Sequence, residues 1–217
     1  MEIRPIAFFK SPVEGKFGVP RQSGVAPDLR GEVRLVAPYD NPDALRGLEG
    51  FDFIWLIWEF SLNGPSANLT VRPPRLGGNE RVGVFASRSP FRPNPLGLSC
   101  VRIDSIDADK GIIHVLGADL ADGTPVYDIK PYVAYADCIP DAVSGFAAEA
   151  PGKKLDVFIP EELLEKALSF MSFPRVTSLI SVRHIKSSFS SRFPICSDRD
   201  KLSTISGSSP KIGRNFI

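Results

Sequence analysis

Residues 72–99 carry the side chains best suited to hold an anionic or planar ligand. Their sequence, RPPRLGGNERVGVFASRSPFRPNPLGLS, sets five arginines among prolines and glycines. Proline fixes its own φ and keeps the preceding residue extended, so this backbone is stiff. A stiff segment that presents guanidinium groups loses little further entropy when it binds a partner. Composition alone is equally compatible with a proline-rich connection whose arginines are solvated.

Two shorter segments add polar groups to tight turns. VPRQSG, residues 19–24, sets a guanidinium and an amide beside a Pro–Gly turn, and can grip a carboxylate or a base edge. DLADGTP, residues 119–125, sets two carboxylates among backbone N–H groups that can bind hydroxyls or an amino group. Each segment taken singly is more often an ordinary turn. Three rigid polar loops on one β scaffold would form a ligand site.

Several classes of site lack their signature in this sequence. There is no GxGxxG after a strand, no GxxxxGK[ST] and no HExxH, so no standard cofactor loop or zinc-protease motif is present. The two histidines are far apart, and the three cysteines form no CxxC pair, so we predict no metal and a cytoplasmic protein. The most apolar run, FIWLIWEF, is far below the roughly 18–20 residues of a membrane span, so we expect no membrane partner.

The hydrophobic pattern predicts a mainly β chain, either a barrel or a sandwich, because short strands recur with turn signals between them. Residues 51–60 read as a strand buried on both faces. Residues 98–106 and 111–116 form a hairpin through DADKG, and residues 42–48 a short helix capped by Asp40 or Asn41. The other expected elements are strands at 3–9, 32–36, 126–129 and 132–135 and a helix at 161–171.

Charge divides the chain of 217 residues unevenly. Residues 172–217 hold eight Lys/Arg and two Asp/Glu, a net charge of 8 − 2 = +6, so the other residues carry 1 − 6 = −5. We expect three regions: a β-barrel domain at 1–155, a helix at 156–171 that begins a truncated or diverged C-terminal region, and a weakly structured, serine-rich tail at 172–217. The basic tail either contacts RNA or is simply solvated.

Four segments together resemble the TsaA-like, or TrmO, family of S-adenosylmethionine-dependent tRNA (adenine-N6)-methyltransferases. They are FGVPRQSG, LRGLEGFDFIWLIWEF, TVRPPRLGGNERVGVFASRSPFRPNPLGLS and DLADGTPVYDIKPY. The resemblance covers residues 3–137. It implies a small, mostly antiparallel β-barrel and a homodimer that binds the cofactor near the subunit interface. It also implies methylation of N6 on the threonylcarbamoyladenosine that follows the anticodon.

The resemblance also implies site residues by motif. Those for S-adenosylmethionine are Pro20, Arg21, Gln22, Phe53, Ile54, Arg88, Leu98, Leu120, Asp122, Gly123, Thr124 and Pro125. Many members have His where this chain has Phe53, so only a backbone contact would survive there. Arg75, Arg81 and Arg92 are candidates for RNA phosphates or the substrate carboxylate. Asp122 or Asp128 would be a weak general base, and the sequence assigns no catalytic residue.

Other functions stay open at this level. A non-catalytic RNA- or nucleoside-binding module could keep the same barrel, and an enzyme of this type could methylate a different small substrate. The C-terminal sequence departs from the family. LDVFIPEELLEKALSFM looks like the start of its small C-terminal domain, but the sequence that follows does not match.

Overall fold

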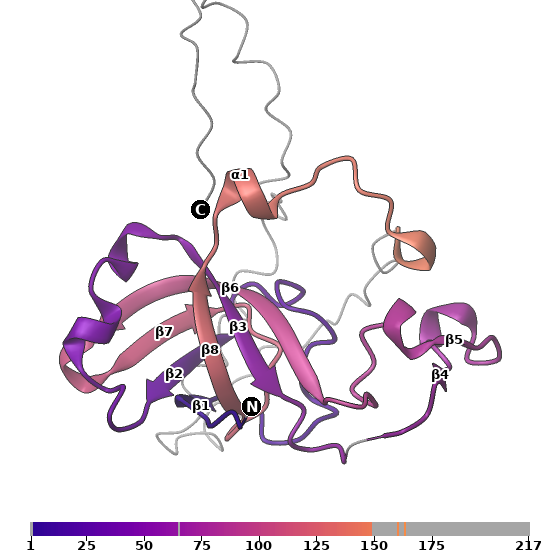
Figure 1. The fold of residues 1–217 in the computed structure, drawn as a ribbon, viewed down its shortest axis with the longest axis horizontal. Helices are drawn as coiled ribbons and strands as arrows, with labels where there is room; N and C mark the ends of the chain where they lie inside the picture. The colour runs from indigo at the N-terminus through magenta and orange to yellow at the C-terminus, as the bar shows by residue number, and fades with distance from the viewer. Residues whose placement is uncertain (1, 65, 149–159, 161–162, 164–217) are drawn as a thin grey trace, which may run out of the picture.

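The fold is a closed β-barrel, seen in a computed structural model that describes residues 2–64, 66–148, 160 and 163 (Figure 1). Six antiparallel strands follow one another around the barrel in the order β1-β2-β7-β6-β3-β8, and β8 pairs with β1 to close it. The strands are β1 (Ala7–Lys10), β2 (Arg30–Leu35), β3 (Phe53–Glu59), β6 (Leu96–Asp107), β7 (Ile112–Leu116) and β8 (Pro125–Pro131). The predicted small antiparallel β-barrel is therefore confirmed.

Alternating burial shows which side chains fill the barrel. Along β3, Ile54, Leu56 and Trp58 are buried, whereas Phe53, Trp55 and Ile57 are half-buried. The prediction that residues 51–60 are buried on both faces was wrong, because a barrel strand has one face inside and one outside. Apolar residues on the outer face of β3 gave the misleading pattern. The rings of Phe53 and Trp55 lie against Tyr132 there, with centroids 6.3 and 5.9 Å away.

The barrel interior is mostly aliphatic, with a few aromatic rings. Its buried side chains come from all six strands and from the turn before β8, and they include Phe9, Val33, Ile54, Leu56, Val101, Ile113, Val115, Leu120 and Val126. Burying one aliphatic or aromatic side chain of this size stabilises the folded state by about 1.5–3 kcal/mol relative to leaving it exposed. This shared core holds the ends of the strands, and the loops that leave them, in fixed relative positions.

Local turn chemistry explains several connections. The predicted hairpin is confirmed: the 3₁₀ helix η5 (Ala108–Lys110) joins β6 to β7, and Gly111 takes the positive φ of 62° that the turn needs. The predicted short helix is a 3₁₀ helix, η1 (Pro42–Leu45), and Asn41 caps it by accepting a hydrogen bond from the Asp43 N–H at 2.9 Å.

Two predicted strands differ from the structure. The first strand begins at Ala7 rather than at residue 3, since pairing with β2 and β8 starts there. The predicted strand at 132–135 is wrong: β8 ends at Pro131 and α1 (Ala134–Asp137) follows. The Asp137 carboxylate accepts hydrogen bonds from the Trp55 indole at 3.0 Å and from the Val133 N–H at 2.8 Å, and so fixes this turn of helix on β3.

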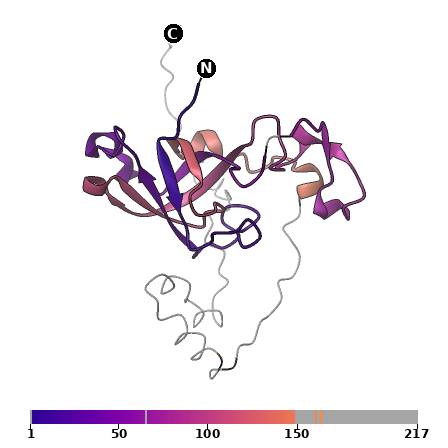
Figure 2. The same cartoon turned by 90° about the horizontal axis from the view of Figure 1, so that it is seen from below.

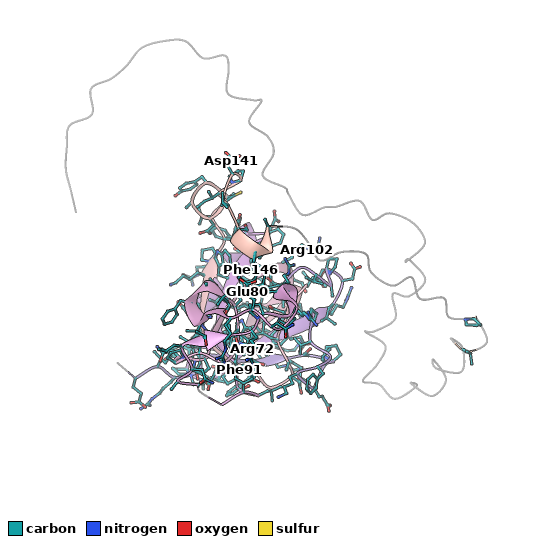
Figure 3. All side chains as sticks on the ribbon, turned by 90° about the vertical axis from the view of Figure 1, so that its right-hand side faces the viewer. Arg72, Glu80, Phe91, Arg102, Asp141 and Phe146 are labelled. Carbon is teal, nitrogen blue, oxygen red and sulfur yellow. The ribbon has the colours of Figure 1, made fainter. Side chains whose placement is uncertain are left out.

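A small lobe lies to one side of the barrel in both ribbon views (Figures 1 and 2). It contains the two-stranded sheet of β4 (Thr70–Val71) and β5 (Val82–Gly83) and the 3₁₀ helices η3 (Pro74–Leu76) and η4 (Val84–Ala86). Most of the arginine–proline segment folds here. Figure 3 looks at the lobe from its outer side and labels Arg72, Glu80 and Phe91.

The expected helix at 161–171 and the tail at 172–217 fall outside the described residues, except for Leu163 within the helix range. The region boundaries at 155 and 171 therefore stay predictions. The remaining described 3₁₀ helices are η2 (Leu48–Gly50) and η6 (Gly145–Ala147). Over the part of the chain that the structure describes, no helix is long and apolar enough to cross a membrane.

Packing of Trp58 on its cross-strand partner Gly97 gives a stability prediction. A Cβ on Gly97 would lie 2.3 Å from the Trp58 indole. Gly97→Ala should therefore lower the free energy of unfolding by about 1–3 kcal/mol, since this part of the core cannot accept another carbon without shifting. Denaturant titration measures the change. Gly83→Ala is the matched control, because φ there is −58° and the structure places no neighbouring atom within 4 Å of a Cβ added at this position. Equal effects at both glycines would contradict the prediction.

Candidate functional site

One cavity of about 620 Å³ opens where the polar segments meet at the end of the barrel. Its volume lies within the range of roughly 300–1,000 Å³ that small-molecule sites occupy. Its walls come from the loop after β1, the end of β3, the segment before β6 and the turn before β8. Aromatic side chains form much of the surface, and polar groups reach it from each loop. This is the arrangement expected of a site for a flat, partly polar ligand.

Backbone and side-chain bonds hold the loop with VPRQSG at the cavity. The Gly24 N–H donates to the Gly117 carbonyl at 2.8 Å, which anchors the loop to the end of β7. The Arg88 guanidinium donates to Oε1 of Gln22 at 2.6 Å and so joins the loop to the arginine–proline segment. These two segments, 66 residues apart in sequence, therefore form one wall.

A hydrogen-bond chain links the barrel core to the cavity. The Trp58 indole N–H donates to the Ser99 Oγ at 2.9 Å, and the Ser99 hydroxyl donates to Oδ1 of Asp119. Trp58 and Asp119 line the cavity, whereas Ser99 is 1% exposed. Burial raises the pKa of the Asp119 carboxyl, and hydrogen bonds from Ser99 and from the backbone of Asp119 and Ser23 partly oppose this shift.

A second carboxylate, Glu59, lines the cavity at the end of β3. It accepts a hydrogen bond from the Tyr127 hydroxyl of β8. This bond, followed by burial, raises the pKa of Tyr127 to about 12, so the phenol stays protonated and remains a donor. Both carboxylates at the cavity are thus held by hydroxyl donors.

The DLADGTP turn is fastened to β1. The Gly123 N–H donates to the Phe9 carbonyl and the Phe9 N–H donates to the Thr124 carbonyl, each at 2.8 Å. The Asp122 carboxylate accepts from Lys10 Nζ at 2.8 Å and from the Ser11 N–H at 2.9 Å. Asp122 therefore closes the turn onto β1 and does not line the cavity.

The structure brings half of the predicted cofactor residues to this cavity. Those that line it are Pro20, Arg21, Gln22, Arg88, Leu98 and Thr124. Those that do not are Phe53, Ile54, Leu120, Asp122, Gly123 and Pro125. Ile54 and Leu120 are buried in the barrel core, with exposed fractions of 0% and 1%. The assignment of these twelve residues to a cofactor stays a prediction.

The three arginines predicted to contact RNA fall in two environments. Arg75 and Arg81 are exposed on the lobe. Arg92 is half-buried in the cavity wall, donates to the Ser87 carbonyl at 2.7 Å, and lies over the Phe85 ring at 6.0 Å. Arg92 therefore connects the cavity wall to the lobe through these two contacts.

The two weak base candidates also have partners of their own. Asp122 is engaged as described, and Asp128 accepts from Lys130 Nζ and the Ile129 N–H, each at 2.9 Å. Asp128 does not line the cavity either. Sequence reasoning missed Asp119, Trp58, Ser99 and Glu59, which lie in or next to the quoted motifs. Only the pairing of β3 with β6 reveals that Trp58 and Ser99 meet.

Among the described residues, no group of three or more His, Cys, Asp or Glu side chains could hold a metal ion. The cavity that the loops build on the barrel, lined by aromatic and polar side chains, suits an organic ligand. Known proteins share this architecture.

The sequence profile of the tRNA-methyltransferase O N-terminal domain matches residues 8–138. A tRNA (adenine(37)-N6)-methyltransferase of Escherichia coli strain K12 is 43% identical over 183 residues, 82% of this chain and 78% of that protein. A Pseudomonas aeruginosa protein named "Putative S-adenosylmethionine-dependent methyltransferase RcsF" is 45% identical over 166 residues, 76% of this chain and 68% of that protein.

A crystal structure of TrmO from Pseudomonas aeruginosa superposes with a TM-score of 0.60 at 39% identity, covering 70% of this chain. The match spans 65% of that crystallised chain, so about a third of its length has no counterpart in the superposition. The chain belongs to the tRNA-methyltransferase O family, as the sequence motifs predicted.

The raised pKa of Asp119 gives a pH-dependent stability. Because the folded protein binds this proton more readily than the unfolded chain, Asp119 contributes stability at acid pH that is lost as pH rises through its raised pKa. The free energy of unfolding of the wild type minus that of Asp119→Asn should therefore fall as the pH is raised above about 4, the ordinary pKa of an aspartate. Denaturant titrations at a series of pH values measure it.

Asp107→Asn is the control of opposite sign. A hydrogen bond from Lys110 lowers the pKa of Asp107, so its contribution is lost as pH falls. The wild-type minus variant difference should rise with pH for Asp107. If the wild-type minus variant free energy of unfolding does not change with pH for Asp119, burial does not destabilise its carboxylate.

Proposed function

We propose that this chain is an S-adenosylmethionine-dependent tRNA methyltransferase that works as a homodimer in the cytoplasm. It transfers a methyl group to N6 of the adenosine that follows the anticodon, in its threonylcarbamoyl form. The observation that carries the proposal is the 43% identity, over most of both chains, to an enzyme named for methylation of adenine 37 in tRNA. A non-catalytic RNA-binding module is less well supported, because the chain keeps a cavity of the size of a small-molecule site.

The cavity suits the proposed cofactor in size and in chemistry. Trp55, Trp58 and Phe60 offer aromatic surface to an adenine ring, and Gln22 and Arg88 offer an amide and a guanidinium to its polar ends. Asp119 and Glu59 offer negative charge to a ligand that carries both an ammonium and a sulfonium. Residues of every required type therefore line one cavity.

In methyl transfer of this kind, the main role of the protein is to align the two reactants. S-adenosylmethionine supplies a methyl group that is already strongly electrophilic. The substrate N6 lies between the purine ring and a ureido carbonyl, which makes its proton more acidic. Holding the two reactants in line can lower the activation barrier of the uncatalysed reaction by roughly 7–11 kcal/mol. The rigid loops around the cavity, tied by the Arg88–Gln22 and Trp58–Ser99 bonds, provide that alignment.

The direct test is methylation of tRNA by the purified protein. With S-adenosylmethionine and tRNA that carries threonylcarbamoyladenosine, we expect this nucleoside to gain the mass of one methyl group. Mass spectrometry of the digested nucleosides measures the gain. tRNA that lacks the threonylcarbamoyl group is the control and should gain nothing. No mass gain in the modified tRNA would refute the proposal.

The arginines should divide between cofactor and tRNA. Arg88→Ala should weaken S-adenosylmethionine binding about 10- to 100-fold, since a charge-assisted hydrogen bond is lost at the cavity wall. Arg81→Ala should leave cofactor binding unchanged, weaken tRNA binding, and reduce the salt slope of that binding by about 1. Calorimetry and filter binding at several salt concentrations measure both. Equal effects of the two substitutions on cofactor affinity would contradict this division.

Apolar side chains around the cavity mouth support the homodimer. Phe17, Leu98 and Phe91 are 94%, 58% and 49% exposed, which is unusual for one edge of a soluble monomer. A second copy over this mouth would bury them. Sedimentation equilibrium should give twice the 23.7 kDa of one chain. Arg46→Ala, at the C-cap of η1 and outside the cavity lining, is a control that should not alter the mass. A single-chain mass at micromolar concentration would refute the dimer.

A further inference from the structure

Both acidic side chains that line the cavity lack an ion-pair partner within the part of the chain that the structure describes. Among the ion pairs within the described residues, none includes Asp119 or Glu59. The guanidinium of Arg88 acts on Asp119 only through space, and it is the weakest of the influences on that carboxylate. Lys16, Arg21, Arg88 and Arg92 also line the cavity, but none of them forms an ion pair with either carboxylate among the described residues. A carboxylate without a direct ion-pair partner in a partly desolvated cavity attracts a cation.

The hydrogen bonds of Asp119 restrict what kind of cation it can hold. An indole N–H only donates, so the Ser99 oxygen accepts from Trp58 and its single proton must point to Asp119. The backbone N–H groups of Ser23 and of Asp119 itself also hydrogen-bond to the carboxylate. Three donors thus occupy most of its roughly four acceptor positions.

We propose that Asp119 is a fixed negative charge that recognises the sulfonium of the methyl donor and makes the cavity favour the donor over its neutral thioether product. The inference rests on the proposed function, because it takes the methyl donor as the ligand. An ammonium group needs several free acceptors, and a general base needs a free lone pair aimed at the proton it removes. A sulfonium has no N–H or O–H to donate. It requires only nearby negative charge and apolar surface.

The surroundings of Asp119 supply both of these. The Trp58 indole, bonded through Ser99, lies in the same wall, and Phe60 packs against it with ring centroids 4.4 Å apart. A polarisable aromatic face also attracts a cation. Burial raises the pKa of Asp119 because its charge is poorly solvated, and a cationic ligand would relieve that cost.

Methyl transfer removes the charge that Asp119 recognises. The bond from sulfur to the methyl carbon breaks, its electron pair stays on sulfur, and the methyl carbon bonds to N6. The sulfur becomes a neutral thioether, and the proton of N6 goes to solvent. The attraction to Asp119 is then lost, so the product leaves more easily than the donor would.

Equilibrium binding tests the inference without any turnover. Isothermal calorimetry with S-adenosylmethionine and S-adenosylhomocysteine should show that the wild type prefers the former. In Asp119→Asn, which keeps the shape and one acceptor oxygen, affinity for S-adenosylmethionine should fall about 10- to 100-fold. Affinity for S-adenosylhomocysteine should change by less than about threefold. Asp107→Asn removes a carboxylate at the far hairpin and should leave both affinities unchanged.

Each other outcome overturns the inference. Equal weakening of both ligands would make Asp119 an ammonium or ribose contact, and unchanged affinities would make it a purely structural group. A wild type that binds S-adenosylhomocysteine more tightly than S-adenosylmethionine overturns it even if the variant does not fold. Failure of the proposed function looks different, because the wild type would then bind neither ligand and methylate no tRNA.

Discussion

The hydrogen-bond chain from Trp58 through Ser99 to Asp119 is the interaction on which the site depends. It begins at a side chain packed in the barrel and ends at a carboxylate that lines the cavity. The indole fits only because its cross-strand partner is Gly97. Core packing therefore fixes the position of a charge in the site. A loop alone could not hold a poorly solvated carboxylate in one place, because burying it without such donors is costly.

The elements of the barrel could be predicted from the sequence wherever a local sequence signal determined the structure. The DADKG turn needed a residue with positive φ and had Gly111, and Asn41 offered a helix cap. Prediction failed where tertiary contacts decided. Residues 132–135 look like a strand because Tyr and Val favour strands. Asp137 instead bonds the Trp55 indole and the Val133 N–H, and these contacts stabilise a helical turn.

The site shows the same division between local and distant signals. The motif resemblance predicted Gln22, Arg88 and Thr124 as site residues, because their segments are distinctive by themselves. All three line one cavity in the structure. The resemblance did not assign Asp119, which lies in the turn before β8 and whose partner Ser99 is 20 residues away on β6. It also did not assign Trp58, the other partner of Ser99, which is 41 residues from Ser99. No periodicity encodes that contact. Asp122, which the motif does point to, is instead held by Lys10 and Ser11.

The hydrogen bonding of each carboxylate separates recognition from proton removal. Asp119 is surrounded by hydrogen-bond donors, so its position is fixed and it has little capacity left to accept a proton from a ligand. Asp122 and Asp128 are engaged by lysines outside the cavity. The proposed reaction agrees with this arrangement, because alignment of the reactants and placement of charge do not require a strong base. A fixed anion and a rigid aromatic wall are what such a reaction requires of its protein.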